Sequence, residues 1–242
     1  VRSSAASDVY KRQEFADRSI AENFNLTAAE KKMIDDVTAA FHRKGKKVTV
    51  ILNVCGVIET ASWIDEPDAV LVAWLPGQEG GNSVADILTG KETPSGRLPM
   101  TWPLSYNDVP SKNDFPVPDD ISEEMLTESL KGFANVRTEG ERKNFDVTTY
   151  NDGIYVGYRY YTTKNVPVSY PFGYGLSYTT FSYSDMRADK AENGDIRVTV
   201  NVKNTGKVSG KEVVQVYVSA PGKDMDKPAR ELKGFALSLI HI

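Results

Sequence analysis

The sequence contains few of the residues that disulfides, metal clusters and nucleophilic catalysis require. Cys55 is the single cysteine among 242 residues, which excludes an internal disulfide and a cysteine metal cluster. We expect its thiol to be buried and inert, because it lies in the apolar run 48–57. The two histidines, His42 and His241, lie at a lysine-rich helix end and in the final dipeptide, which gives no support for Ser-His catalysis. We expect His42 to face solvent near the C-terminus of a helix.

Long apolar runs and an excess of positive charge are also missing. The longest apolar run, 69–75, is strand-sized and falls far short of the ~20 residues that a membrane-spanning helix needs. The formal net charge is −4 and basic residues form no cluster, which argues against a nucleic-acid partner. No basic segment followed by an apolar stretch opens the chain, so no signal peptide is visible and the compartment stays open.

Signatures of nucleotide binding are incomplete. The glycine-rich turn 76–81 could present backbone N–H groups to a phosphate at the start of a helix. However, Gly90 and Lys91 are followed by Glu92 instead of Ser or Thr, and no G-x-G-x-x-G occurs. The sequence therefore implies no cofactor.

The first half of the chain alternates between helix and strand patterns. Thr27 and Glu30 have the spacing of a capping box, and apolar residues then recur at helical intervals up to Gly45. The β-branched runs 48–54 and 69–74 suit strands that are covered on both faces, as in a parallel sheet. Another helix is expected over 81–88. This order predicts a layered α/β domain.

The last third of the chain has the pattern of antiparallel strands. Apolar residues alternate over 196–202 and recur over 213–218, and a turn signal lies at 204–206. We interpret this part as a β-sandwich of the fibronectin or immunoglobulin sort, with about half of the usual strands. The polar stretch 119–145, inside the α/β part, is interpreted as an insertion loop.

One acidic segment near the N-terminus could supply glycosidase chemistry. A glycosidase needs one carboxyl group that is protonated near neutral pH and a second carboxylate on the opposite side of the sugar. Glu14, Asp17 and Arg18 lie in such a segment, but the chain has 33 acidic residues, and the residues alone do not single out Glu14.

Four motifs together resemble the β-glucosidases of glycoside hydrolase family 3. They are the segments 73–82, 94–99, 153–161 and 170–178, and their order and spacing also match the family. The resemblance runs from about residue 14 to residue 236. It implies a three-layer αβα sandwich over 14–175, followed by a truncated fibronectin type III-like domain.

Further limits follow from the same resemblance. The fibronectin-like part would cover 176–236 and would lack several strands. The ends 1–13 and 237–242 depart from the family pattern, and we expect both to be non-native. Family 3 enzymes also carry a barrel domain with an aspartate nucleophile, which is expected to be missing here.

The resemblance also assigns roles to residues. Glu14 matches the general acid/base of a G-E-x-x-D-R-like loop, although Gln13 stands where the family has Gly, and Asp17 with Arg18 would shape that loop. The intact enzyme would be a retaining exo-glycosidase that cleaves terminal β-linked sugars, glucose above all. Without its barrel, the chain is expected to have no turnover.

Several alternatives stay open at this point. The sugar could be xylose or N-acetylglucosamine, or the chain could be a non-catalytic module that binds carbohydrate or protein. The insertion could overhang the site or contact a second subunit in a homodimer. We expect packing roles for Trp74 and for the aromatic-glycine corner 172–175, and Tyr158, Tyr160 and Tyr161 alternate as strand residues do.

Overall fold

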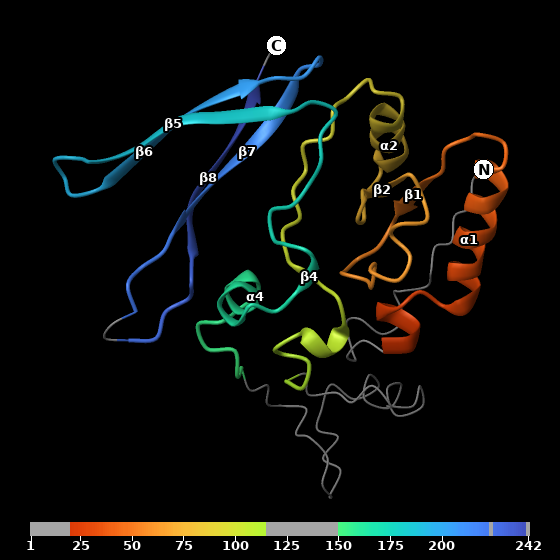
Figure 1. Cartoon of the computed structure of the whole chain (residues 1–242), viewed down its shortest axis with the longest axis horizontal. Coiled ribbons are helices and arrows are strands. Elements are labelled where there is room, and N and C mark those ends of the chain that lie inside the picture. The colour runs from red at the N-terminus through yellow and green to blue at the C-terminus, as the bar shows by residue number, and fades with distance from the viewer. Residues whose placement is uncertain (1–19, 115–149, 223–224, 241–242) are drawn as a thin grey trace, which may run out of the picture. The chain divides into compact units, whose positions relative to one another are not determined.

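The computed structural model describes residues 20–114, 150–222 and 225–240 (Figure 1). The chain divides into two compact units that are interleaved along the sequence. Unit 1 contains residues 1–77 and 102–170, and unit 2 contains residues 78–101 and 171–242. The insertion predicted over 119–145 lies outside the described residues.

The described part of unit 1 begins with two helical segments. The π-helix η2 (Ile20–Phe24) is followed by α1 (Ala28–His42), for which Thr27 is the N-cap. The predicted capping box is confirmed, because Glu30 N donates to Thr27 Oγ1 at 3.3 Å and Thr27 N donates to Glu30 Oε2 at 2.8 Å. Two orphan backbone N–H groups are thereby satisfied at the helix start.

Two short strands of unit 1 pair in parallel. β1 (Thr49–Leu52) and β2 (Ala69–Val72) align with Thr49 opposite Ala69 and Leu52 opposite Val72. Both predicted strands and their parallel relation are therefore confirmed, although each strand ends two residues earlier than its apolar run. The crossover between them contains Trp63, whose side chain is 1% exposed.

The second part of unit 1 adds a small antiparallel pair and two short helices. β3 (Trp102–Pro103) pairs with β4 (Val168–Tyr170). The 3₁₀ helix η3 (Tyr106–Asp108) and the helix α4 (Tyr158–Lys164) complete the described elements of this unit.

The strand predicted from Tyr158, Tyr160 and Tyr161 is wrong, because these residues form α4. The two residues that flank the helix explain the difference. Gly157 has φ +56°, and Asn165 ends the helix in the left-handed conformation with φ +53°. Such end residues favour a short helix, and they override the β-propensity of the tyrosines.

Aromatic rings pack around Trp102 in unit 1. Trp102 is 1% exposed, and its ring centroid lies 6.0 Å from that of Trp74 and 6.4 Å from that of Tyr170, both edge to face. Trp74 thus has the packing contact that the sequence suggested.

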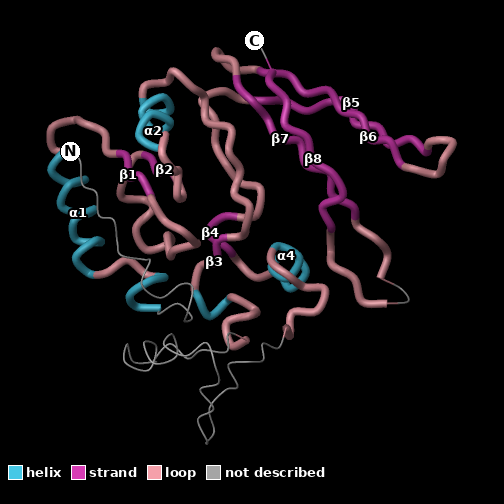
Figure 2. The backbone as a smooth tube through the Cα atoms, turned by 180° about the vertical axis from the view of Figure 1, so that it is seen from behind, coloured by secondary structure: helices cyan, strands magenta, loops and turns pink. Residues whose placement is uncertain are grey.

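Unit 2 contains one helix and two β-hairpins. α2 (Gly80–Leu88) ends before Gly90, close to the predicted helix 81–88. The antiparallel strands predicted from the alternating pattern are confirmed (Figure 2). The first hairpin pairs β5 (Phe181–Lys190) with β6 (Ile196–Asn204), and the second pairs β7 (Gly210–Val218) with β8 (Glu231–Ile240).

Asn204 organises the turn that follows β6. Its Oδ1 atom accepts hydrogen bonds from Thr179 Oγ1 at 2.6 Å and from Gly206 N at 3.0 Å. Its Nδ2 atom donates to the carbonyl oxygens of Val208 and Ile240, at 2.7 and 3.2 Å. One buried amide therefore joins the turn 204–206 to the end of β8, where 237–240 pair with β7. That 237–242 is non-native stays a prediction.

Candidate functional site

The three predicted site residues precede the first described residue. Glu14, Asp17 and Arg18 lie outside the described residues, which begin at Ile20. The structure therefore describes the chain only from Ile20 onward. The roles assigned to Glu14, Asp17 and Arg18 stay predictions.

Phe24 anchors the first described stretch in unit 1. Its side chain is 2% exposed, and its carbonyl oxygen accepts a hydrogen bond from Glu59 N at 2.7 Å. Its ring meets that of Tyr106 edge to face, with centroids 5.6 Å apart and an interplanar angle of 62°. The buried Phe24 ring and this backbone hydrogen bond thus attach the stretch from residue 20 onward to the rest of unit 1.

The N-terminus of α1 is already occupied by its own side chains. Thr27 N and Thr27 Oγ1 both donate to Glu30 Oε2, each at 2.8 Å. A carboxylate at this position satisfies the partial positive charge of the helix end. The cap therefore serves the fold, as expected from the sequence, and it offers no place for an anionic ligand.

The carboxyl ends of β1 and β2 are the edge where open α/β sheets usually bind ligands. Trp74 lies just beyond β2 with φ +53°, in the left-handed region that bulky residues seldom adopt, and Gly77 follows with φ +70°. These two residues turn the chain sharply after the strand.

Among the described residues, no group of three His, Cys, Asp or Glu side chains could hold a metal ion.

Cys55 lies in the loop after β1 and is exposed, so its expected burial is wrong. β1 already ends at Leu52, and the chain bends at residues 55 and 56. Burial alternates along this stretch, with Leu52 and Val54 buried while Asn53 and Cys55 face outward. An apolar run predicts burial of every member only where a strand is covered on both faces throughout.

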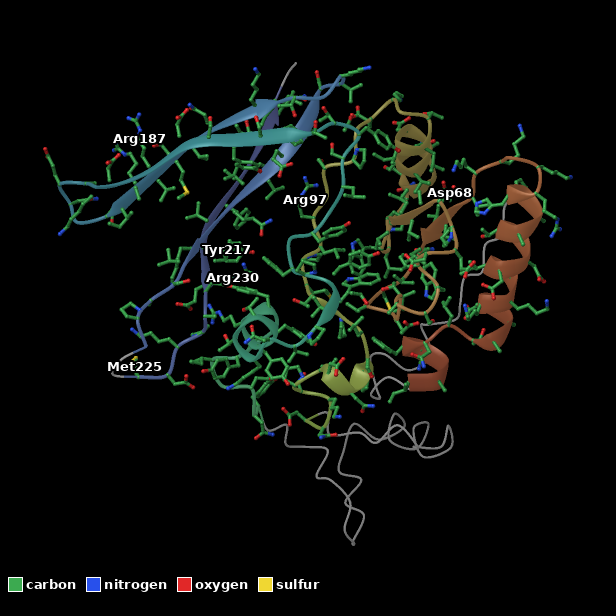
Figure 3. All side chains as sticks on the ribbon, in the orientation of Figure 1. Asp68, Arg97, Arg187, Tyr217, Met225 and Arg230 are labelled. Carbon is green, nitrogen blue, oxygen red and sulfur yellow. The ribbon has the colours of Figure 1, made fainter. Side chains whose placement is uncertain are left out.

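Asp68, which is labelled in Figure 3, lies just before β2 and binds three groups. Its carboxylate accepts hydrogen bonds from Lys47 Nζ at 2.6 Å, from Val48 N at 2.8 Å, and makes a 2.8 Å contact with His42 Nε2. The Lys47 ammonium, then the Val48 N–H and His42, hold the pKa of Asp68 well below its usual range. Asp68 therefore stays ionised and is unsuited to donate a proton.

His42 is exposed at the C-terminal end of α1, as the sequence suggested. Its side chain is 41% exposed, and its Nε2 atom also contacts Asp68. The pair joins the end of α1 to the start of β2. A separation of 26 residues along the chain hides this contact from any local pattern.

Two of the sequence motifs meet in unit 2. Leu98 N donates to the carbonyl oxygen of Tyr174, and Gly173 N donates to the carbonyl oxygen of Leu98, both at 2.8 Å. Gly173 has φ +81°, and a Cβ there would collide with the side chain of Gln215. The motifs 94–99 and 170–178 thus pack directly on each other and on β7, which supports the packing role expected for the aromatic-glycine corner.

A nearly buried ion pair closes the same region. The Nη2 atom of Arg97, which is labelled in Figure 3, lies 2.6 Å from Glu212 Oε2, and the two side chains are 11% and 12% exposed. Tyr183 Oη donates to Glu212 Oε1 at 2.8 Å. Burial, together with this hydrogen bond to Glu212, raises the pKa of Tyr183 to about 12. We call Arg97, Glu212 and Tyr183 the polar clasp.

Sequence reasoning missed the polar clasp and the Phe24 anchor. Arg97 and Glu212 are 115 residues apart, so no spacing rule connects them. Phe24 could have been noticed as an apolar residue shortly before a capping box, which often packs against the adjoining structure.

Family comparisons match both parts of the chain. The Glycosyl hydrolase family 3 C-terminal domain matches residues 3–178, and the Fibronectin type III-like domain matches residues 212–239. The chain belongs to glycoside hydrolase family 3. The expected α/β domain with a fibronectin-like part is thereby confirmed, and the motifs that carried the resemblance lie within a true family relation.

Individual family 3 proteins show the same relation. Beta-glucosidase B of Emericella nidulans is 39% identical over 193 residues, and thermostable beta-glucosidase B of Acetivibrio thermocellus is 41% identical over 191 residues. These matches cover 78% of this chain but 21% and 22% of the two relatives. The chain thus spans about a fifth of the length of these family 3 enzymes.

A solved structure extends the likeness to three dimensions. Beta-glucosidase 3B from Thermotoga neapolitana, determined in complex with glucose, superimposes with a TM-score of 0.77 at 42% sequence identity. The match covers 93% of this chain and 28% of that enzyme.

Within the residues that the structure describes, no helix has the length and apolar character needed to cross a bilayer.

Proposed function

We propose that this chain is the part of a retaining, exo-acting β-glucosidase that carries the general acid/base. The observation that supports this most directly is the 42% identity with Thermotoga neapolitana beta-glucosidase 3B across nearly the whole chain. That enzyme and the two relatives described above are named β-glucosidases, which favours glucose over the xylose and N-acetylglucosamine alternatives.

Glu14 has two tasks in this proposal. It protonates the glycosidic oxygen as the first sugar bond breaks, and it later removes a proton from the water that hydrolyses the glycosyl-enzyme intermediate. A barrel domain outside this chain supplies the aspartate nucleophile and most contacts to the reacting sugar. Asp17 and Arg18 pair with each other and shape the loop.

The position of Glu14 along the sequence supports the first task. The residue falls within the range that matches the family 3 domain, and the segment behind it is tied into the buried interior of unit 1 through Phe24. A general acid needs such a support, because proton transfer requires hydrogen-bond distance to the leaving oxygen.

The test uses the full-length enzyme, recovered from its source and expressed with Glu14→Ala. We expect kcat on p-nitrophenyl β-glucoside to fall by about 10²- to 10⁴-fold. Azide should restore part of it and yield β-glucosyl azide, because the small anion replaces activated water at the glycosyl-enzyme. Glu66→Ala, at an exposed acidic residue of unit 1, is the matched control and should leave kcat unchanged. Full activity of Glu14→Ala would remove this residue from the site.

The same proposal predicts that the 242-residue chain alone has no turnover, since the nucleophile is elsewhere. Incubation with p-nitrophenyl β-glucoside, at a protein concentration high enough to detect one turnover per hour, checks this. Hydrolysis that survives repurification and disappears with Glu14→Ala would show that the chain is catalytically complete.

A further inference from the structure

We infer that the turn between β5 and β6 is a site of spontaneous deamidation at Asn193. The turn covers residues 191–195 and joins the two strands of the first hairpin (Figure 1). Asn193 and Gly194 form the only Asn-Gly pair in the 242-residue sequence. Loss of ammonia from the Asn193 side chain converts this residue to aspartate or isoaspartate and loosens the hairpin.

Gly194 leaves the side-chain amide of Asn193 open to attack. In deamidation, the backbone nitrogen after an asparagine must reach the amide carbon of that asparagine, and glycine has no Cβ to hinder the approach. Gly194 has φ +89°, and apart from its chain neighbours no atom lies within 4 Å of the point where a Cβ would stand. Asn193, Gly194 and Asp195 are all exposed, so water and hydroxide reach the turn.

Two hydrogen bonds to Asp195 orient the Asn193 side chain. Asn193 Oδ1 accepts from Asp195 N at 3.1 Å, and Asn193 Nδ2 donates to Asp195 Oδ2 at 2.6 Å. Because both bonds span Gly194, they hold the side-chain amide folded along the backbone of that glycine. The Asp195 N–H also points at the oxygen that becomes negative when the amide carbon is attacked, which is how an oxyanion is stabilised.

The reaction has two steps, and hydroxide and water are its co-reactants. Hydroxide removes the proton from Gly194 N, this nitrogen bonds to Asn193 Cγ, and the Cγ–Nδ2 bond breaks as ammonia leaves with a proton taken from water. Water then opens the resulting five-membered succinimide. Cleavage at Cγ gives aspartate, and cleavage at the backbone carbonyl carbon gives isoaspartate, whose main chain runs through Cβ and Cγ.

The folded turn must open slightly before this reaction starts. Gly194 N donates to the carbonyl oxygen of Ala191 at 2.9 Å, and this bond has to break before the nitrogen can lose its proton. A second bond, from Ala191 N to the carbonyl oxygen of Asp195 at 2.8 Å, closes the hairpin. Exposed backbone hydrogen bonds of this kind open at a small cost in free energy, so the folded chain permits the reaction.

Asn82 provides an internal comparison in the same unit. It is exposed and is followed by the small residue Ser83, but it lies within α2. Ser83 N donates to the carbonyl oxygen of Glu79 at 3.0 Å, and Asn82 Nδ2 donates to Glu79 Oε2 at 2.7 Å. The helical backbone keeps Ser83 N engaged, and the Ser83 Cβ hinders its approach. We therefore expect Asn82 to deamidate far more slowly than Asn193.

Both products disturb the turn that forms them. Aspartate at position 193 replaces the donor Nδ2 by an oxygen that faces Asp195 Oδ2, so a 2.6 Å hydrogen bond becomes a repulsion between two carboxylates. The neighbouring exposed Glu192 adds a further negative charge. Isoaspartate lengthens the main chain of a turn whose length fixes the strand register. The end of the β5–β6 hairpin should therefore fray after deamidation.

The test follows the mass of two peptides from the 242-residue chain. The folded chain is aged in mildly alkaline buffer and digested at acidic pH, and mass spectrometry counts the peptides in which OH has replaced NH₂. We expect the peptide with Asn193 to convert at least about tenfold faster than the peptide with Asn82, and Gly194→Ala to slow conversion about tenfold or more. Asn193→Gln, which would need a six-membered ring, should also slow it while keeping Gly194.

The rate should rise with pH, because the Gly194 nitrogen attacks only after it has lost its proton. Conversion of Asn193 that is no faster than that of Asn82 would overturn the inference. The same holds if Asn193 converts in the urea-unfolded chain and stays unchanged in the folded chain.

Brief trypsin treatment of the folded chain tests the loosened hairpin. Lys190 and Arg197 flank the turn, and we expect cleavage there to be at least about threefold faster in the aged chain than in the fresh chain. Cleavage after Lys233, in β8, should not change. Asn193→Asp should reproduce the faster cleavage without ageing, and aged Asn193→Gln should not show it. Unchanged cleavage in a fully converted chain would mean that deamidation does not loosen the hairpin.

Discussion

Different interactions stabilise the interior of each of the two compact units. Prolines apart, every buried apolar side chain in the described part of the chain belongs to unit 1. These residues are Phe24, Ile34, Leu52, Val54, Ile58, Trp63, Trp102 and Tyr161. Unit 2 instead buries polar groups, such as Thr179 and Asn204, and the nearly buried polar clasp. Unit 1 thus depends on apolar burial, and unit 2 depends on strand pairing and polar contacts.

The surface of unit 2 reflects the same difference. Its hairpins expose large apolar side chains, among them Met186 on β5 and Phe235 on β8, which are 76% and 74% exposed. A two-stranded hairpin is marginally stable in water unless a further layer covers it. We therefore expect the polar clasp to contribute to unit 2 the stability that unit 1 gains from burying apolar side chains.

The largest expected effect is the loss of an aromatic ring from unit 1. Trp63→Ala should lower the free energy of unfolding by about 3–5 kcal/mol, because it removes a fully buried ring and leaves a cavity. Urea titration followed by circular dichroism measures this. Tyr150→Ala, at a side chain that is 85% exposed in the same unit, is the control and should stay within about 0.5 kcal/mol. Similar losses for both variants would contradict the apolar interior described for unit 1.

A smaller loss is expected when the polar clasp of unit 2 is broken. Arg97→Met leaves Glu212 nearly buried without its charged partner and should cost about 3 kcal/mol in urea titration. Adding Glu212→Leu should recover most of this. The exposed pair Lys233–Glu231, 3.1 Å apart, offers the control Lys233→Met, which should cost less than about 0.5 kcal/mol. A loss no larger than this control would mean that unit 2 does not depend on the clasp.

The smallest effect appears only at alkaline pH. Burial, with the nearby charge of Asp108, raises the pKa of Tyr161 in unit 1 from 10.0 to about 12. Because the folded state favours the protonated phenol, its contribution is fully present below pH 10 and is lost as pH rises toward 12. The free energy of unfolding of the wild type, relative to that of Tyr161→Phe, should therefore be constant up to pH 10 and then fall. A constant difference across this range would show that the pKa of Tyr161 is the same in the folded and the unfolded state.

Much of this fold follows from local sequence patterns. Thr27 and Glu30 predict the start of α1 because both halves of a capping box lie within four residues. The β-branched runs predict β1 and β2, and strict alternation predicts β6. In these cases the physical cause lies within a few residues of its effect.

Predictions were wrong where a neighbour or a distant partner decides the outcome. Gly157 and Asn165 turn a tyrosine-rich segment into α4, and the early end of β1 leaves Cys55 exposed. Asp68 and Arg97 bind partners that are 20 to 115 residues away, which no periodicity encodes. Of the candidate site, the sequence supplies Glu14 by family resemblance alone, while the Phe24 anchor needs three-dimensional contacts.

The 115-residue separation inside the polar clasp also has a meaning for the protein during its synthesis. At roughly 5–20 residues per second, the ribosome needs about 6–23 seconds after adding Arg97 before it adds Glu212. Throughout that interval the guanidinium must remain hydrated, and the motif 94–99 has no strand of the second hairpin to pack on. The nascent chain can therefore close the polar clasp of unit 2 only after Glu212 has been added, and until then its apolar hairpin faces are accessible to chaperones.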